Sequence, residues 1–139
     1  MGNNTVQNEK IKVILCSTYK NGEEQENRIS LEELEKLTET AECECVGIID
    51  QKRETPDVRT VLGKGKIEEL SEMCKNLLVS LVVFDCELSP SQIKSIEEDI
   101  GGEVSVIDRS MLILDIFADH ARTAEGRLQV ELAQLKYTS

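Results

Sequence analysis

Glycine and lysine alternate in one short segment, Gly63-Lys64-Gly65-Lys66, whose composition could hold an anion. Glycines let the backbone approach a ligand closely, and the N–H groups at the start of a helix attract negative charge. A nucleotide-binding phosphate loop has the form G-x-x-x-x-G-K-[ST], but no glycine stands at that distance before either Gly-Lys pair, and no Ser or Thr follows one. Gly63 and Gly65 are therefore candidates for a backbone anion site that takes an RNA or nucleotide phosphate. The alternative is a plain turn with solvated lysines.

Three aspartates, Asp50, Asp85 and Asp108, each stand at the end of a predicted β-strand. In an open parallel sheet, the carboxyl ends of the strands line the edge where ligands bind. Carboxylates gathered there could bind Mg²⁺ or act as acid and base, which makes these residues the metal-site candidates. The alternative is that each aspartate caps the following helix or faces water.

The charge of the chain is strongly acidic but unevenly distributed. A net charge of −11 opposes nucleic-acid binding, because that affinity comes largely from Lys and Arg displacing counterions. Residues 51–66 are the exception, since they carry five basic residues against two acidic ones. One short basic stretch therefore lies in an acidic body.

The cysteines and the hydropathy pattern indicate a cytoplasmic protein. The five cysteines have irregular spacing, and Cys43-x-Cys45 lacks the C-x-x-C form of zinc or redox sites, so we expect buried thiols in a reducing compartment. No apolar run is long enough to cross a bilayer, so no membrane span is predicted.

Strands are predicted from short apolar segments rich in β-formers. These segments are Lys12–Ser17, Val46–Asp50, Leu81–Asp85 and Val104–Asp108.

Two helices are predicted from capping residues and apolar spacing. Ser30 and Glu33 have the spacing of a capping box, which predicts that a helix begins at Ser30 after a polar loop over Asn21–Asn27. The second helix is predicted to begin near Gly65 or Lys66.

A third helix has the clearest local pattern of the chain. Ser89-Pro90-Ser91-Gln92 supplies an N-cap serine, a proline at the first helical position and a glutamine at the third, and Gly101-Gly102 supplies the stop. From Ser110 onward the pattern is helical, and Leu128, Leu132 and Leu135 form an apolar stripe that continues to the end.

This order of elements predicts the α/β class, with a four-stranded, mainly parallel sheet in the order 2-1-3-4 and helices on both faces. We divide the chain into a disordered or tag-like start at 1–10, an α/β domain at 11–109, and helices at 110–139.

Five blocks of sequence resemble the HflX family of GTPases. They are Pro56–Lys66 (PDVRTVLGKGK), Glu87–Gln92, Val106–Ser110, Leu112–Ala121 (LILDIFADHA) and Arg122–Tyr137 (RTAEGRLQVELAQLKY).

The resemblance implies an N-terminal α/β domain, a pair of long antiparallel helices and a GTPase domain. The helix beginning near Thr123 would be the truncated first arm of that pair, and the GTPase domain would lie beyond Ser139. This fragment would then have no catalytic residue and no cofactor of its own. GTP and Mg²⁺ would be bound by the GTPase domain of the parent protein.

The same resemblance implies partners. Members of the family bind the large ribosomal subunit and its RNA, and several separate the subunits of stalled ribosomes under stress. The N-terminal domain adds ribosome contacts and tunes its own GTPase domain. An apolar arm without its partner predicts helix-mediated self-association of the fragment.

The basic residues inside the matching blocks are the candidates for ribosome or phosphate contact. They are Arg59, Lys64, Lys66, Arg109, Arg122 and Arg127. Ion pairs within the chain are the alternative for Arg109, Arg122 and Arg127. An alternative function is an ATP-binding domain with weak hydrolase activity, since ATP binding has been assigned to this domain in some family members.

Overall fold

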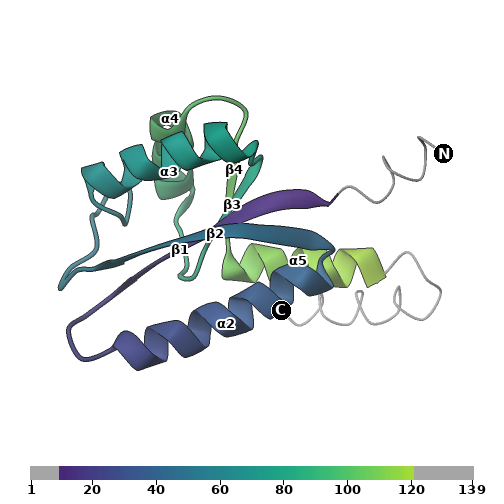
Figure 1. Cartoon of the computed structure of the whole chain (residues 1–139), viewed down its shortest axis with the longest axis horizontal. Coiled ribbons are helices and arrows are strands. Elements are labelled where there is room, and N and C mark those ends of the chain that lie inside the picture. Colours follow the sequence, from purple (N-terminus) through teal and green to yellow (C-terminus); the bar gives the residue numbers. More distant parts are fainter. Residues whose placement is uncertain (1–9, 121–139) are drawn as a thin grey trace.

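Four parallel strands form the centre of the molecule, and their spatial order is β2-β1-β3-β4. The computed structural model describes residues 10–120, and Figure 1 shows how their elements are arranged. The α/β class, the parallel sheet and the strand order 2-1-3-4 are all confirmed.

All four strands are parallel, and apolar side chains are buried on both faces of the sheet. The four are β1 (Ile11–Tyr19), β2 (Cys43–Lys52), β3 (Leu81–Phe84) and β4 (Ser105–Asp108). Every neighbouring pair is parallel. β1 and β3 occupy the centre, so their apolar side chains are shielded on both faces, which explains the unbroken apolar runs Val13–Cys16 in β1 and Leu81–Phe84 in β3. The register of β1 against β2 shifts between Val13 and Ile14.

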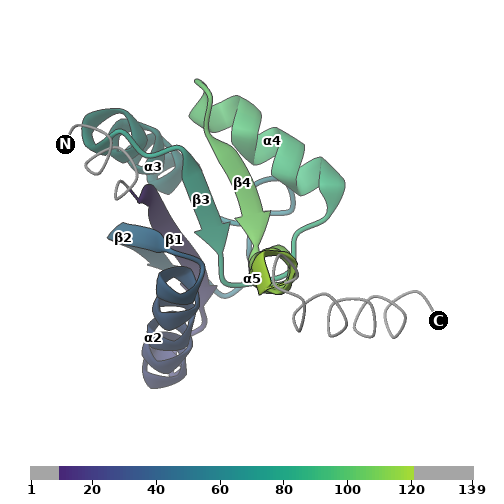
Figure 2. The ribbon, with the colours of Figure 1, turned by 90° about the vertical axis from the view of Figure 1, so that its right-hand side faces the viewer.

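Helices cover both faces of the sheet. α2 (Glu24–Thr40) and α5 (Arg109–His120) lie on one face, and α3 (Lys64–Leu77) and α4 (Pro90–Ile100) lie on the other (Figure 2). Successive residues of β1 point alternately to the two faces. Val13 and Leu15 therefore pack with α2 and α5, whereas Ile14 and Cys16 pack with α3 and α4.

The helix starts agree with the sequence at α3 and α4 but not at α2. In α4, Ser89 Oγ accepts a hydrogen bond from the Gln92 N–H, and Gln92 Oε1 accepts one from the Ser89 N–H, which confirms the capping box. Gly101 and Gly102 have φ values of 77° and 67°, which confirms the predicted stop after this helix.

The predicted capping box at Ser30 is wrong, because α2 begins at Glu24 and Ser30 lies within it. The segment predicted as a polar loop, Asn21–Asn27, is non-helical only over its first three residues, and its last four form the first turn of this helix. Its residues are polar because the start of α2 is mostly exposed to solvent, so no apolar periodicity indicates the helix there.

The C-terminal region is described only in part. α5 begins at Arg109, directly after β4, so the predicted helix from Ser110 is confirmed as far as His120. The predicted arm from Thr123, together with Arg122 and Arg127, lies outside the described residues. Between residues 10 and 120, the protein has no helix with the length and hydropathy that crossing a membrane requires.

Candidate functional site

The segment Gly63–Lys66 forms the junction between the loop after β2 and helix α3. Gly63 is the N-cap, and α3 begins at Lys64, close to the predicted start. The Gly63 N–H donates to Gln51 Oε1 at 2.8 Å, so this donor is already used inside the protein. A Cβ atom at Gly63 would lie 2.5 Å from Arg53 Nη1, so glycine lets that side chain pack closely. Of the two glycines predicted to form an anion site, only Gly65 lies in open space.

The two lysines of this segment differ in their surroundings. Lys66 Nζ lies 3.6 Å from Glu69 Oε1 on the next turn of α3. Lys64 is exposed, and no carboxylate of residues 10–120 lies within ion-pair distance of its Nζ. The exposed start of α3 therefore carries one lysine that can bind an external anion.

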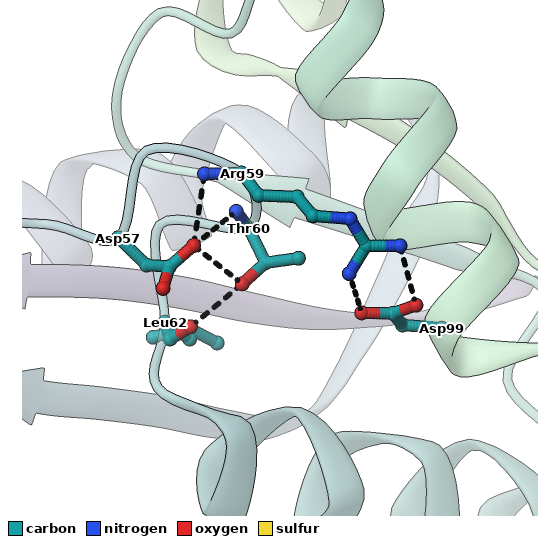
Figure 3. Close-up of polar contacts among 5 residues, drawn as sticks. All are labelled: Asp57, Arg59, Thr60, Leu62 and Asp99. Carbon is teal, nitrogen blue, oxygen red and sulfur yellow. Dashed lines mark hydrogen bonds and ion pairs between the residues drawn. The ribbon is translucent and has the colours of Figure 1, made fainter.

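Arg59, the third basic candidate of the loop, is held by a carboxylate on α4. Its Nη1 lies 2.7 Å from Asp99 Oδ2, and its Nη2 lies 3.0 Å from Asp99 Oδ1 (Figure 3). This two-pronged geometry fixes the plane of the guanidinium group. Arg59, predicted only as a contact for RNA or phosphate, therefore forms an intramolecular ion pair in this structure.

The backbone next to Arg59 is organised by Asp57. Asp57 Oδ1 accepts hydrogen bonds from the N–H groups of Arg59 at 2.8 Å and Thr60 at 2.9 Å, and from Thr60 Oγ1 at 3.3 Å (Figure 3). The Thr60 hydroxyl also donates to the carbonyl of Leu62. Hydrogen bonds from the Thr60 N–H and then the Arg59 N–H hold the pKa of the Asp57 carboxyl below its usual value. An aspartate at the first position of a turn commonly accepts hydrogen bonds from the N–H groups two and three residues later. Asp57 could therefore have been predicted from the sequence to organise this loop.

The three aspartates at the carboxyl ends of the strands have separate structural roles. Asp108 Oδ1 accepts the Met111 N–H at 2.9 Å and caps α5, and its Oδ2 accepts the Leu88 N–H at 3.0 Å. Asp50 Oδ2 accepts from Asn27 Nδ2 at 3.0 Å. Within residues 10–120 no group of three or more His, Cys, Asp or Glu residues is arranged to hold a metal ion, so the structure does not bring these aspartates together as ligands.

Arg109 joins three elements at this edge of the sheet. Its Nη1 donates to Asp85 Oδ1 and to Ser30 Oγ, each at 3.1 Å, and its Nη2 donates to Glu33 Oε2 at 3.2 Å. The Asp85 side chain is only 6% exposed, so this arginine neutralises a nearly buried charge. An intramolecular role is therefore observed for Arg109 as well.

No disulfide joins the five cysteines, all of which lie in the described part of the chain, and Cys16, Cys43 and Cys74 are buried as predicted. The prediction of burial is wrong for Cys45 and Cys86, which are partly exposed. Burial, together with the nearby Asp85 and Asp108 carboxylates, raises the pKa of the Cys86 thiol to about 11. The thiol is thus protonated at neutral pH, which disfavours a nucleophilic role.

An apolar groove separates α4 from α5. It has a volume of about 540 Å³, and its apolar lining is Leu88, Pro90, Ile93, Met111 and Leu114. Met111, Leu114 and the nearby Phe117 are among the exposed large hydrophobic residues of the protein. A stripe of this kind on a surface helix is typical of a contact with another protein segment.

Comparison with known proteins gives consistent matches. Residues 28–118 match the family described as GTP-binding GTPase N-terminal. The chain is 47% identical to GTPase HflX of Alkalihalophilus pseudofirmus over 125 residues, which cover 90% of this chain and 29% of that protein. It is 46% identical to GTPase HflX of Escherichia coli over 107 residues, which cover 77% of this chain and 25% of that protein.

A solved structure has a similar fold. The GTP-binding protein of Sulfolobus solfataricus, determined in complex with GDP, aligns with a TM-score of 0.59 and 26% identity over 91% of this chain and 37% of that chain. The chain thus spans roughly a third or less of the length of the relatives it matches.

Proposed function

The chain belongs to the GTP-binding GTPase N-terminal family, as the N-terminal part of an HflX-type GTPase, and from that premise we propose that it is a ribosome- and RNA-binding module. In this proposal the parent protein acts on the large ribosomal subunit in the cytoplasm, in splitting or rescue of ribosomes under stress. The module contributes contacts and regulation, and it has no catalytic step of its own.

The observation that carries the proposal is the exposed Lys64 at the start of α3. Its position combines a free ammonium group with the N–H groups of a helix N-terminus, and both attract a phosphate. The surrounding stretch, residues 51–66, is the basic part of an acidic chain. A local contact of this kind adds to the affinity of a larger protein even where the module alone binds weakly.

The other basic candidates support the proposed RNA contact less strongly than Lys64 does. Arg59, Lys66 and Arg109 each have a carboxylate partner, which an RNA phosphate would have to displace. Arg122 and Arg127 lie outside the described residues and remain proposed contacts from the family resemblance.

Charge reversal at Lys64 tests the proposal. We expect Lys64→Glu in the full-length protein to weaken co-sedimentation with purified large ribosomal subunits and to make binding less sensitive to salt. Lys75→Glu is the matched control, because Lys75 is exposed on the same helix three turns away. Equal binding of the Lys64→Glu variant and the unchanged protein at several salt concentrations would contradict the proposal.

Regulation of the GTPase part of the longer protein is a second proposed role, and the groove between α4 and α5 favours it. Leu114 and Met111 present apolar surface beside this groove, at the end of the sequence that the structure describes. We propose that the groove receives the part of the HflX-type protein that bears GTP and Mg²⁺. Leu114→Asp in the full-length protein should raise the rate of GTP hydrolysis by releasing that contact. Leu78→Asp, which changes a more exposed leucine at the C-cap of α3, should leave the rate unchanged, and equal rates for all three proteins would contradict this role.

Nucleotide binding by this chain itself has less structural support. The Gly63 N–H is already used, and Gly63–Lys66 does not fit the pattern of a phosphate loop. Titration of the chain with ATP and Mg²⁺ in a calorimeter tests this alternative, and a saturable heat would favour it over the RNA-binding role.

A further inference from the structure

The outer edge of strand β4 is already occupied. The Ser105 N–H donates to the Ser80 carbonyl, so the backbone of Ser105 faces β3. Because the backbone groups of successive residues in a strand point to opposite sides, the N–H of Val106 points outward. It donates to Glu97 Oε2 at 2.9 Å, so a side chain of α4 covers the outward donor of this short strand.

The outer edge of β2, at the other end of the sheet, is open. The Arg53 N–H, directly after this strand, donates to the Tyr19 carbonyl at 2.9 Å. By the same alternation, Ile48, Asp50 and Lys52 direct their N–H and C=O groups away from β1. In the described part of the chain no strand pairs with this side of β2, and no side chain covers these groups as Glu97 covers β4. An open edge of this kind is a template for pairing with another extended segment.

A groove of about 380 Å³ lies between β2 and helix α2, which are neighbours at one side of the molecule (Figure 2). Its apolar lining consists of Tyr19, Leu31 and Ile48, and Ile48 is 44% exposed. The opposite flank of α2 is held by α5 through the hydrogen bonds to Ser30 and Glu33. The flank beside β2 therefore faces the groove, and the groove offers apolar surface directly next to the open strand edge.

The flank of α2 beside the groove carries glutamates that the protein leaves unneutralised. Glu32, Glu35 and Glu39 follow one another at three and four positions, which places them on one side of the helix. Glu32 and Glu35 line the groove, and all three line a hollow beside it together with Lys36. None of the three forms an ion pair in the part of the chain that the structure describes. Like charges at this spacing destabilise a helix, so folding does not explain the arrangement.

The groove as a whole has an excess of negative charge. Its lining contains four acidic residues and one basic residue, Arg28. One of the four, Glu24, has a cationic partner, since Lys52 Nζ lies 3.9 Å from its Oε2. Three acidic residues therefore remain against one base, and the surface is complementary to a ligand with positive charge.

We propose that the outer edge of β2 and the groove beside it bind an extended, lysine- or arginine-rich segment of another protein, which adds a fifth strand to the sheet. The outward N–H and C=O groups of β2 pair with the main chain of that segment, Ile48 and Tyr19 contact an apolar side chain, and the unpaired glutamates attract its basic side chains.

Other occupants fit this surface less well. RNA is disfavoured because its phosphates would approach carboxylates that have no cationic partner. A second copy of this chain is disfavoured because it would bring a surface of the same negative sign to the groove. The groove lies on the α2 face of the sheet, whereas Lys64 begins α3 on the other face, so this inference does not rest on the proposed RNA contact.

A labelled peptide in which lysine and valine alternate is the probe, and its fluorescence anisotropy measures binding to the full-length protein. We expect saturable binding that weakens as salt is added. Ile48→Thr, which keeps a β-branched residue in the strand, and Glu32→Lys should each weaken the affinity by about fivefold. Glu68→Lys is the matched control, because Glu68 is exposed on α3 at the other face of the sheet, and its affinity should equal that of the unchanged protein.

Pairing through the backbone is tested with the same peptide carrying N-methyl groups on alternate amides. This peptide keeps every side chain but cannot donate hydrogen bonds along one edge, so it should lose binding. Equal binding of the methylated and unmethylated peptides would overturn the addition of a strand. A peptide in which glutamate and valine alternate should not bind, and equal affinity for it would overturn the role of charge.

The remaining outcomes separate the partner from its alternatives. Absence of peptide binding by the unchanged protein would overturn the inference. So would displacement of the peptide by a single-stranded RNA oligonucleotide, or a dimer of the unchanged protein in sedimentation that Ile48→Thr dissociates, because the edge would then bind RNA or a second copy. Melting curves check that both variants stay folded. If Ile48→Thr unfolds, the exposed Glu32→Lys decides, and unchanged peptide affinity of that variant would contradict the proposed site.

Discussion

Arg59 and Asp99 are forty positions apart in the sequence and form a two-pronged ion pair, with N–O distances of 2.7 and 3.0 Å. The pair joins the loop after β2 to helix α4 and occupies a guanidinium group that the sequence alone presents as an RNA contact. Whether this arginine also binds a phosphate depends on how easily Asp99 is displaced. The pair is largely exposed to solvent, so we expect its contribution to stability to be small.

Removing the carboxylate at Asp99 should free Arg59 for an external anion. We expect Asp99→Asn in the full-length protein to bind large ribosomal subunits more tightly, with a salt slope steeper by about one. Fluorescence titrations at several salt concentrations measure this slope. Glu98→Gln removes the same charge from the neighbouring position and is the control. If both variants change the slope equally, the effect comes from net charge and not from Arg59.

Asp57 should make stability depend on pH in the acidic range. The pKa of its carboxyl is lowered in the folded state, so the carboxylate stabilises the fold above the unfolded pKa, and this stabilisation is lost as pH falls through the folded pKa. The variant Asp57→Asn cannot lose a proton, so its deficit relative to the unchanged protein should be largest near neutral pH and should shrink below about pH 4. Urea unfolding at a series of pH values measures the difference, and a constant deficit would contradict the assignment.

Replacing Arg109 should destabilise the protein through Asp85. In Arg109→Met, the nearly buried Asp85 carboxylate loses its charged partner, and we expect a loss of about 1–3 kcal/mol in the free energy of unfolding. The double variant Arg109→Met, Asp85→Asn should recover part of that loss, because no unpaired charge remains. Urea denaturation of both variants tests this, and equal stability of the single and double variants would show that Asp85 is not the cause.

The Cys86 thiol should react slowly with alkylating reagents. A pKa of about 11, against a usual value of 9.0, lowers the thiolate fraction at neutral pH by about 100-fold. We expect the alkylation rate of Cys86, followed by peptide mass spectrometry, to rise with pH up to about 11. Folding stability should fall between pH 9 and 11, because the folded state holds this proton more tightly than the unfolded chain does. A rate that levels off near pH 9 would contradict the raised pKa.

Local patterns in the sequence predicted the fold where the interacting residues are neighbours. The capping box of α4 involves Ser89 and Gln92, which contact each other directly. Ser30 has the same apparent pattern, but its hydroxyl accepts a hydrogen bond from Arg109, seventy-nine positions away, and the residues before it are already helical. A short motif could not reveal that tertiary partner.

The contacts of the candidate site are also of two kinds, local ones that the sequence could predict and distant ones that it could not. The turn organised by Asp57 is local, and its sequence pattern could have indicated it. The sequence identified Arg59 and Arg109 as basic candidates, but their carboxylate partners come from helix α4 and from the end of β3. Which cations are already neutralised therefore follows only from the packing of the helices on the sheet. Lys64 is exposed in the structure, as the alternative of a turn with solvated lysines predicts.

Asp108 is the last residue of β4 and is immediately followed by the first residue of α5, so strand and helix are joined without a linker. The same carboxylate holds the start of α5 through Met111 and the loop after β3 through Leu88. A force applied to α5 would therefore reach the sheet with no slack to absorb it. This helix is fixed at its base, and reorienting it requires breaking the bonds of Asp108 together with those of Arg109 to Asp85, Ser30 and Glu33.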